Sequence, residues 1–370
     1  MKKSTKKLIA TMLTTVMLIS TAIFSTACDN REEIVVYNWG EYIAEETIAK
    51  FEEAYPQYKV VYREFETNET MYPALSNSYD VIVPSEYMVC RLINEERIQP
   101  LDWSLLPAVT EHMDPMFNEL QYSSDEELSN EVLDYAVPYM YCTVGLVYDA
   151  NRIDIPEGTT DPEIIWGALF DEMNADQVGM YDAMRESIGV ALNYLGYSIN
   201  TMDEAQLQEA LELLIEQKEI LNPAYGVDNL KDKMASGELA ASVAWSGDHI
   251  VMLDRIEELG TTDIDLRFVL PEGSNWSVDM MCVPTNAKNY EGAHAFINFM
   301  YDPQIALENC EYVGYSTPNV EAKAMLDPEI SGNIYYYPTQ EVFSTLEVYY
   351  SSAIIEERYA ELWNTVKASS

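Results

Sequence analysis

Short strand-like segments alternate with helix-like segments along this chain, and the alternation restricts the folds that it can form. Residues 34–39, 58–65 and 79–83 are short runs rich in β-branched and aromatic side chains, whereas 43–55 and 88–98 carry apolar side chains at helical spacing. A repeated strand–helix–strand unit predicts a largely parallel sheet with helices on both faces.

The alternation resumes in the second half of the chain, after a long predicted strand at 137–148. No Gly-, Ser- or Pro-rich linker separates the two halves. The further predicted elements are helices at 161–173, 184–195 and 203–218, a strand at 239–245, a helix from about residue 248, strands at 265–270 and 278–283, a helix at 290–301 and a closing helix at 356–367.

We therefore expect an α/β protein of two lobes that are connected by crossing strands rather than by a flexible linker. The expected bounds are 31–147 and 279–322 for the first lobe, and 148–278 and 323–370 for the second. The length of 370 residues agrees with two domains of about 150 residues each.

The first 27 residues have the pattern of an export signal. Four lysines precede an apolar run at 8–24, which is short for a membrane helix of about 20 residues, and small residues follow it. Cys28 comes next, as in a bacterial lipoprotein signal, although Ser25 stands where such signals usually have leucine. We expect Cys28 to be lipidated and 28–33 to be a tether on the extracytoplasmic side of the cell membrane. An ordinary signal peptide and an uncleaved anchor are the alternatives.

The charge of the chain excludes one class of partner. With 21 Lys+Arg and 63 Asp+Glu, the formal net charge is 21 − 63 = −42, and removal of 1–27 takes away four lysines and no acid, which leaves 17 − 63 = −46. Such a chain repels nucleic acid phosphates, so no nucleic acid partner is expected. The acidity by itself is equally compatible with a solvated surface and with a cationic ligand.

Cysteine, histidine and the known catalytic motifs give no sign of an enzyme or a metal site. The chain has no phosphate-binding loop, GxGxxG, HExxH or GxSxG motif, and we expect no cofactor. The histidines form no ligand-spaced pair, so no metal site is expected: His112, His249 and His294. Four cysteines are widely spaced in apolar stretches, which favours buried thiols over disulfides: Cys90, Cys142, Cys282 and Cys310.

Aromatic residues stand beside acids or hydroxyls near the ends of predicted strands, where ligands bind in open α/β sheets. Asp182 and Glu186 open a predicted helix, and Tyr315 lies in a later loop. The residues at the strand ends are Trp39, Glu41 and Tyr42; Ser85 and Tyr87; Trp245 and Asp248; and Trp276 and Asp279.

These side chains suit a ligand with cationic ends and an apolar middle. Aromatic faces attract cations by roughly 0.5–2 kcal/mol, carboxylates pair with ammonium groups, and flat rings cover methylene chains. Linear polyamines such as putrescine and spermidine have this form. Other interpretations remain open: Asp182 and Asp248 as helix caps, Trp39 and Trp245 as core residues, and Tyr87 as surface packing.

Several segments, in order along nearly the whole chain after residue 34, resemble the spermidine/putrescine-binding proteins of bacterial polyamine ABC importers. The resemblance implies a two-lobed periplasmic-binding-protein fold with a ligand cleft between the lobes, and a membrane permease and an ATPase as partners. The segments are YNWGEY at 37–42, YDVIVPS at 79–85, Arg185–Glu186 with LGY at 195–197, VPTNAKN at 283–289 and VGYSTPN at 313–319.

The resemblance also implies roles for single residues. Ser85 becomes a polar contact, Glu186 and Asp279 become amine-binding carboxylates, and Asp248 matches an acid found in putrescine-preferring relatives. The aromatic walls become Trp39, Tyr42, Tyr87, Trp245 and Tyr315.

Two positions depart from the family pattern. Ala183 stands where spermidine-preferring relatives have aspartate, with Asp182 one residue away, and Ser277 stands where an aromatic residue is common, with Trp276 one residue away. A shift of one residue along a strand points the side chain to the other face. These departures favour putrescine, or mixed specificity, over strict spermidine binding.

The sequence therefore predicts a binding lipoprotein of an ABC importer that captures polyamines between its lobes. A binding lipoprotein for another small solute is one alternative, and a surface enzyme or adhesin is another. An amino-acid ligand needs an arginine for its carboxylate, and the candidate is Arg185, which we expect to pair with an acid instead.

Overall fold

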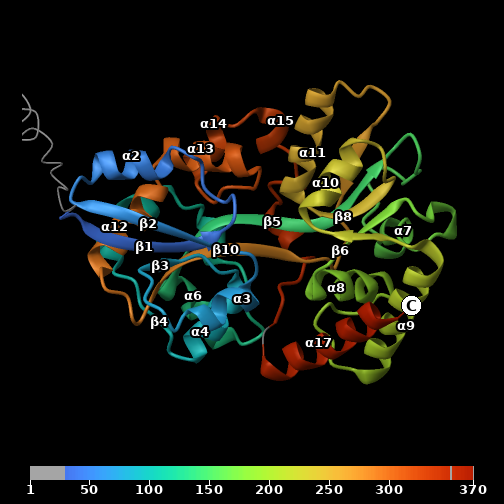
Figure 1. Ribbon diagram of the computed structural model, residues 1–370, viewed down its shortest axis with the longest axis horizontal. Coiled ribbons are helices and arrows are strands. Elements are labelled where there is room, and N and C mark those ends of the chain that lie inside the picture. Colours follow the sequence, from blue (N-terminus) through green and yellow to red (C-terminus); the bar gives the residue numbers. More distant parts are fainter. Residues whose placement is uncertain (1–29, 351, 370) are drawn as a thin grey trace, which may run out of the picture.

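The computed structural model describes residues 30–350 and 352–369, which form two lobes sharing one continuous sheet path (Figure 1). The strand order along that path is β2-β1-β3-β10-β5-β8-β6-β7, with β4 paired to β10 and β9 paired to β5. The predicted signal 1–27 and Cys28 lie outside the described residues. The sheet starts at Glu32, inside the predicted tether 28–33.

The first lobe begins with the predicted strand–helix–strand unit. Strand β1 (Glu32–Trp39) pairs in parallel with β2 (Tyr58–Phe65) and with β3 (Val81–Ile82). The other elements of this part are helices α2 (Thr47–Ala54), α3 (Asn68–Ala74) and α4 (Glu86–Asn94), strand β4 (Ile98–Gln99), helices α5 (Pro107–His112) and α6 (Glu126–Tyr135), and 3₁₀ turns at Trp103–Leu105 and Pro115–Asn118.

Two long strands connect the lobes, and their direction corrects the prediction of a largely parallel sheet. Strand β5 (Ala136–Asp149) is buried along its whole length and is antiparallel to β8, β9 and β10. Strand β10 (Trp276–Pro284) is also antiparallel to β3. The sheet is therefore mixed. A buried strand is continuously apolar in either direction, so its side chains do not reveal which way it runs.

The second lobe repeats the parallel arrangement around β6 (Val178–Tyr181), which pairs in parallel with both β7 and β8. The predicted helix 161–173 is shorter than expected and is followed by a 3₁₀ turn at Glu172–Asn174. The remaining elements are α7 (Pro162–Gly167), α8 (Met184–Tyr194), α9 (Glu204–Leu221), β7 (Ala224–Gly226), α10 (Asp228–Ala235), β8 (Ala241–Trp245), α11 (Ser246–Leu259) and β9 (Leu266–Val269).

After β10 the chain covers the first lobe and then crosses once more. Helix α17 (Ala353–Ala368) ends beside α8 and α9 in the second lobe, far from the helices that precede it (Figure 1). The helices before it are α12 (Tyr290–Met300), α13 (Pro303–Val313), α14 (Val320–Met325), α15 (Pro328–Ser331) and α16 (Gln340–Phe343). The predicted lobe bounds stay a prediction, since β5 and β10 run through both halves.

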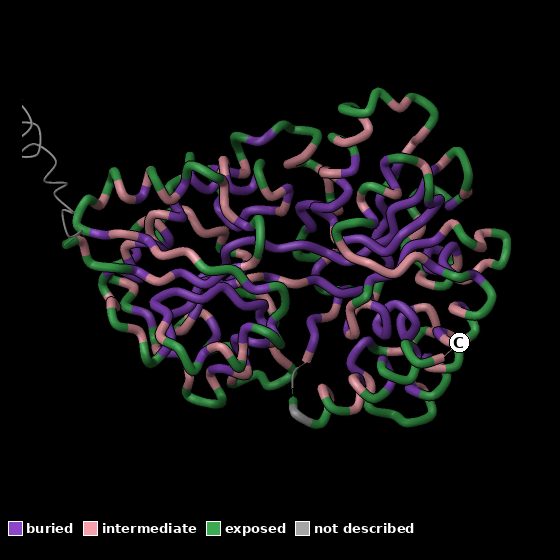
Figure 2. Tube along the Cα trace, in the orientation of Figure 1, coloured by how far each residue is buried: buried purple, intermediate pink, exposed green. Residues whose placement is uncertain are grey.

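The core follows the crossing strands. Figure 2 shows buried residues concentrated along the central strands, and exposed residues on the outer turns and helices. The four cysteines of the described chain are buried free thiols, as predicted. Within residues 30–350 and 352–369, no helix has both the length and the apolar character needed to cross a membrane.

Candidate functional site

Asp279 on β10 is the centre of the first-lobe part of the site. Its Oδ2 accepts a hydrogen bond from the Tyr42 hydroxyl at 2.7 Å, and its Oδ1 accepts one from Ser85 Oγ at 2.8 Å. The side chain is half-buried, and the loss of solvent contact raises its pKa to about 6, while the two hydroxyl groups oppose that rise. Tyr42 and Ser85, which come from distant segments of the chain, thus meet at the carboxylate of Asp279.

The local backbone explains how Tyr42 and Ser85 reach Asp279. Tyr42 follows a turn in which Glu41 is exposed and takes a left-handed φ of 53°. Ser85 stands at the N-cap position of α4, but its hydroxyl caps no backbone N–H and binds Asp279 instead. Serine at an N-cap usually accepts a hydrogen bond from the helix backbone, but the hydroxyl of Ser85 donates to the Asp279 carboxylate instead.

A hydrogen-bond chain that the sequence did not reveal extends from Ser85. The buried Asn68 donates to Ser85 Oγ at 3.1 Å and to the Tyr87 hydroxyl at 2.9 Å, and Tyr87 donates to Glu69 Oε1 at 3.0 Å. Asn68 and Glu69 follow β2 as the other polar residues follow their strands, so the same positional signal was available for them. Asn68 fixes the positions of two predicted site residues at once.

Glu86 is a second acid that the sequence prediction missed. Its side chain is fully buried, and its Oε2 accepts hydrogen bonds from Ser277 Oγ at 2.7 Å and from the Val278 N–H at 3.0 Å. Its Oε1 has no hydrogen-bond partner within the described parts of the chain, and burial raises its pKa to about 7. Serine at 277, which departs from the family pattern, is therefore the residue that holds Glu86 against β10.

Asp248 and Tyr181 form the second-lobe part of the site. Asp248 is buried, and its Oδ2 accepts from the Tyr181 hydroxyl at 2.8 Å, which itself accepts from the Trp245 N–H at 2.8 Å. The rings of Tyr181 and Trp245 lie 4.5 Å apart. Lys231 Nζ lies 3.4 Å from Asp248 Oδ1. Burial raises the pKa of Asp248, and Lys231 and Tyr181 oppose the rise.

The interpretation of Asp182 and Asp248 as helix caps is wrong. Helix α8 begins after Ala183, and α11 begins after Trp245; neither of these N-cap positions has a side-chain cap. Asp182 is exposed, and its nearest cation is Lys367, at 3.9 Å. The structure does not bring Asp182 to the other acids.

Glu186 lies in the first turn of α8 and is half-buried. Burial raises its pKa to about 7, Glu69 of the first lobe adds to the rise, and Arg185 opposes it. Burial and the charge of Glu69 also raise the pKa of Glu356 in α17. Acids from both lobes therefore influence one another's protonation beside Tyr87.

Arg185 forms no salt bridge with an acid of the described residues, which corrects the prediction that it pairs with one. It is 6% exposed, its guanidinium carbon lies 4.6 Å from the Tyr349 ring centre and 4.5 Å from that of Tyr359, and its Nη2 donates to Asn200 Oδ1 at 2.8 Å. Two aromatic faces stabilise this cation. Arg185 is therefore buried between two aromatic rings, and its Nε and Nη1 have no hydrogen-bond partner among the described residues.

Four of the predicted aromatic residues are half-buried and retain exposed surface: Trp39, Tyr87, Trp245 and Tyr315. Tyr315 lies 5.7 Å from the ring of Tyr42 and also packs on Gly247, where an added Cβ would come within 2.1 Å of the Tyr315 ring. Tyr315 thus touches both parts of the site.

Trp276 lies elsewhere. It is 3% exposed, and its ring packs on Phe343 at 5.0 Å and on Tyr122 at 6.1 Å between centres. Adjacent residues of a strand point to opposite faces, so Trp276 and Ser277 cannot both face Asp279. Ser277 shares the face of Asp279, and Trp276 belongs to the core.

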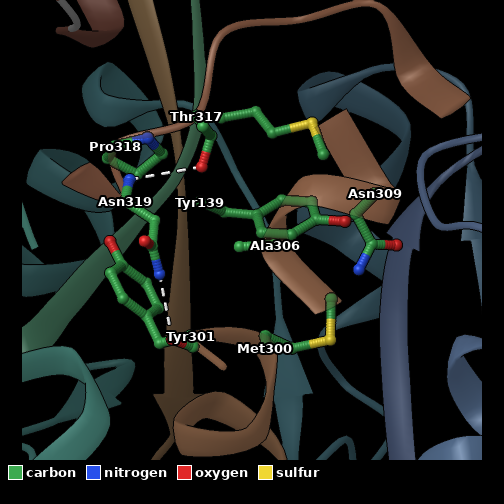
Figure 3. Close-up of a pocket in the computed structure, with 9 residues that line it drawn as sticks. Tyr139, Met300, Tyr301, Ala306, Asn309, Thr317, Pro318 and Asn319 are labelled. Atoms are coloured by element: carbon green, nitrogen blue, oxygen red, sulfur yellow. Dashed lines mark hydrogen bonds between the residues drawn. The ribbon is translucent and has the colours of Figure 1, made fainter. Parts of the chain in front are cut away.

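A small cavity lies in the first lobe, beside strand β5 and helices α12 and α13 (Figure 3). Its volume is about 10 Å³, and it is bounded by Tyr139 of β5, Asn309 of α13 and Asn319 in the loop before α14. That space holds at most one water. The Tyr139 hydroxyl donates to the Tyr42 carbonyl at 2.7 Å, so this region positions Tyr42 and is not itself a ligand site.

A second cavity, of about 140 Å³, adjoins Tyr87 and Tyr349. Throughout the described parts of the chain, no three or more His, Cys, Asp or Glu side chains are arranged to hold a metal ion. The buried His249 Nδ1 contacts the Tyr336 hydroxyl at 2.6 Å, and His294 Nε2 accepts from the Asp102 N–H at 3.0 Å. These two histidines have structural partners.

Comparison with known proteins identifies relatives over most of the chain. The family model described as bacterial extracellular solute-binding protein matches residues 46–334. The spermidine/putrescine-binding periplasmic protein of Salmonella typhimurium is 33% identical, over 91% of this chain and 92% of that protein. The putrescine-binding periplasmic protein SpuD of Pseudomonas aeruginosa is 30% identical, over 91% of each chain.

A solved structure agrees with these relatives. The spermidine/putrescine ABC transporter substrate-binding protein PotD from Streptococcus pneumoniae is 33% identical and superposes with a TM-score of 0.74. The match covers 91% of this chain and 98% of that one. The likeness therefore extends through both lobes.

Proposed function

The chain belongs to the bacterial extracellular solute-binding protein family, and on this premise we propose that it binds a linear polyamine, putrescine or spermidine, between its two lobes. Its relatives are solute-binding proteins, so the chain is a binding protein and not an enzyme. The observation that carries the proposal is Asp279: two hydroxyl groups orient its oxygens, and no cationic side chain of the described residues forms a salt bridge with it.

In the proposed complex, one ligand ammonium pairs with Asp279 and contacts Ser85. The neutral donors orient the carboxylate without neutralising it, so an incoming cation gains a strong charge-assisted hydrogen bond. A second ammonium lies toward Glu186 and Asp248 of the other lobe. The apolar chain between them is covered by the aromatic residues with exposed surface and by Tyr42.

Three predicted site residues have other roles in this proposal. Glu41 is an exposed acid that attracts cations from solution before they bind. Asp182 and Trp276 make no ligand contact, because the former is exposed and apart from the other acids and the latter is in the core.

We propose that ligand binding closes the lobes and that the closed form is delivered to a membrane permease with its ATPase. A ligand favours closure only by contacting both lobes, and the proposed acids belong to both. The bounds proposed for the lobes are 31–147 with 279–322, and 148–278 with 323–370. The crossing segments then act as the hinge.

We also propose that the protein is exported and held at the outer face of the cell membrane. The support is the sequence pattern of 1–27, with four lysines, an apolar run and Cys28. Lipidation at Cys28 would keep the binding protein close to the permease.

Calorimetric titration of the purified protein with putrescine and with spermidine tests the function. We expect binding at micromolar or lower concentrations. The matched control is butane-1,4-diol, which keeps the four-carbon chain of putrescine but lacks its charges and should give no heat. Absence of heat for both polyamines, or equal binding of the diol, would contradict the proposal. An amino acid is a further control, since Arg185, the candidate partner for its carboxylate, is only 6% exposed.

A further inference from the structure

Glu86 lies where helix α4 meets strand β10. It is the first residue of α4, and its side chain is fully buried. Its Oε2 accepts hydrogen bonds from Ser277 Oγ at 2.7 Å and from the Val278 N–H at 3.0 Å. Ser277 and Val278 directly precede Asp279 on β10. The carboxyl group of Glu86 therefore holds the backbone that leads into the proposed ligand-binding acid.

The contact with Val278 continues a backbone pairing by means of a side chain. On the edge of β10 that faces α4, the Met280 N–H donates to the Pro84 carbonyl at 2.8 Å. After Pro84 the chain turns into α4, and two residues along β10 the buried Val278 N–H donates to Glu86. Buried backbone N–H groups require an acceptor. Glu86 thus takes the place of a strand carbonyl at this point.

Two consecutive residues of the chain hold the same stretch of β10. Ser85 forms a β-bridge with Asp279 and donates its hydroxyl to that side chain at 2.8 Å, while Glu86 holds the two preceding residues. On the opposite edge, the pairing of β10 with β5 shifts register between Asp279 and Met280. A bulge of this kind bends a strand and changes the direction of its side chains. The direction of Asp279 therefore depends on the contacts that fix the backbone beside the bulge.

These contacts do not require Glu86 to be ionised. Burial raises its pKa to about 7, the hydrogen bonds from Ser277 and Val278 oppose the rise, and the charge of Asp279 adds to it. Both hydrogen bonds end at Oε2, whereas Oε1 has no partner within residues 30–350 and 352–369. Oε2 stays an acceptor when Oε1 carries a proton. An amide oxygen in the same position can therefore replace it.

We propose that Glu86 is a positioning residue for the ligand: by holding Ser277 and Val278, it fixes the backbone from which Asp279 presents its carboxylate to a ligand ammonium. The inference rests on the proposed function, because that function gives Asp279 its ligand contact. It concerns how this acid is held and gives Glu86 no ligand contact of its own.

The first test compares two substitutions by calorimetric titration with putrescine. Glu86→Met removes the acceptor but keeps a side chain of similar length, so we expect the dissociation constant to rise about tenfold or more. Glu86→Gln keeps an oxygen for both donors and should stay within about threefold of the native value. The matched control is Glu95→Met, the same substitution at an exposed residue at the other end of α4, which should change the constant by less than about twofold.

The second test asks whether Glu86 acts through Asp279. Asp279→Asn has already lost the carboxylate, so adding Glu86→Met to it should weaken binding by no more than about a further twofold, because residues that act through one another give non-additive losses. Circular dichroism and a melting curve establish that each variant is folded. If Glu86→Met does not fold, Ser277→Ala replaces it. We expect Ser277→Ala to weaken binding about fivefold alone and less than about twofold beside Asp279→Asn.

The outcomes separate the inference from the proposed function. Native affinity in Glu86→Met, or losses that multiply in the double variant, would overturn the inference and leave the proposed function standing. Equal losses in Glu86→Gln and Glu86→Met would also overturn it, because they would show that charge and not the hydrogen bonds is needed. Failure of the native protein to bind either polyamine would overturn both.

Discussion

Asp279 and Asp248 lie in the two lobes and are held in opposite ways. Asp279 receives two hydroxyl groups, from Tyr42 and Ser85, and Asp248 receives one hydroxyl group and the Lys231 ammonium. Neutral donors orient a carboxylate and leave its charge uncompensated, whereas an ammonium compensates it. Among the described residues, the charge of Asp279 is therefore uncompensated by a cation, whereas that of Asp248 has Lys231 beside it.

The strongest test of this comparison is Asp279→Asn. The substitution keeps the shape of the side chain and removes its charge, so we expect putrescine affinity to fall roughly 100-fold or more, since truncating one partner of a buried charge pair costs about 2–5 kcal/mol. Calorimetric titration measures the change. The matched control is Asp182→Asn, the same substitution at an exposed acid, which should change affinity by less than about twofold. Similar losses in the two variants would show that long-range charge, and not the site, attracts the ligand.

A smaller effect separates the two acids in the absence of ligand. Asp248→Asn leaves Lys231 with only its exposed partner, so we expect the free energy of unfolding to fall by about 1–3 kcal/mol. Asp279→Asn should leave it unchanged or raise it, because that carboxylate has no internal cation to lose. Urea unfolding of both variants measures the difference. Equal destabilisation would mean that the two carboxylates are equivalent in the unliganded protein.

The pH dependence of binding sharpens the comparison further. Burial raises the pKa of Asp279 to about 6, above its usual value of about 3.9, so the carboxyl loses its proton as the pH rises through 6. Putrescine affinity should therefore increase about tenfold between pH 5 and pH 7, with release of a proton on binding. Titrations in two buffers of different ionisation enthalpy measure both quantities.

The stability of the unliganded protein should change with pH in the opposite direction to the putrescine affinity. The folded-state pKa of Asp279 lies above the unfolded one, so the folded form binds more protons between about pH 4 and pH 6, and its unfolding free energy falls as the pH rises. Glu86 and Glu186, each raised to about 7, add to this slope. Asp279→Asn should weaken the pH dependence of putrescine affinity and also that of the unfolding free energy. An affinity that is independent of pH would exclude ionisation of Asp279 as a requirement for binding.

The sequence pointed to candidate site residues whose chemical group suits a cationic ligand. It did not point to residues whose role depends on which side chains lie next to them in the fold. Tyr42, Ser85 and Asp279 were recognisable as aromatic, hydroxyl and acid groups at strand ends, and hydrogen bonds join them in the folded chain, while their contact with a ligand stays a prediction. Asn68 and Glu86 were not singled out, although both follow predicted strands as the chosen residues do, and their sequence positions do not show which side chains they contact. Only the fold shows that Ser277 holds Glu86.

For the fold itself, side-chain patterns located most strands but not their directions. Several helices escaped prediction, among them α6, α13 and α14, and the continuous apolar character of β5 was compatible with either direction. The direction of a strand depends on which strand lies alongside it, and that is decided by contacts between residues that are far apart along the chain.

By itself, the sequence determined the α/β class, the two-lobe organisation, the buried thiols and the residue types suited to a cationic ligand, because periodicity, composition and motif order are local properties. The tertiary structure alone decided that the sheet is mixed, that Trp276 and Asp182 lie apart from the other site residues, and that Arg185 and Lys231 are already engaged. The physical reason is that the charge available to a ligand depends on which cation lies within a few ångströms of each acid. That distance exists only in the folded chain.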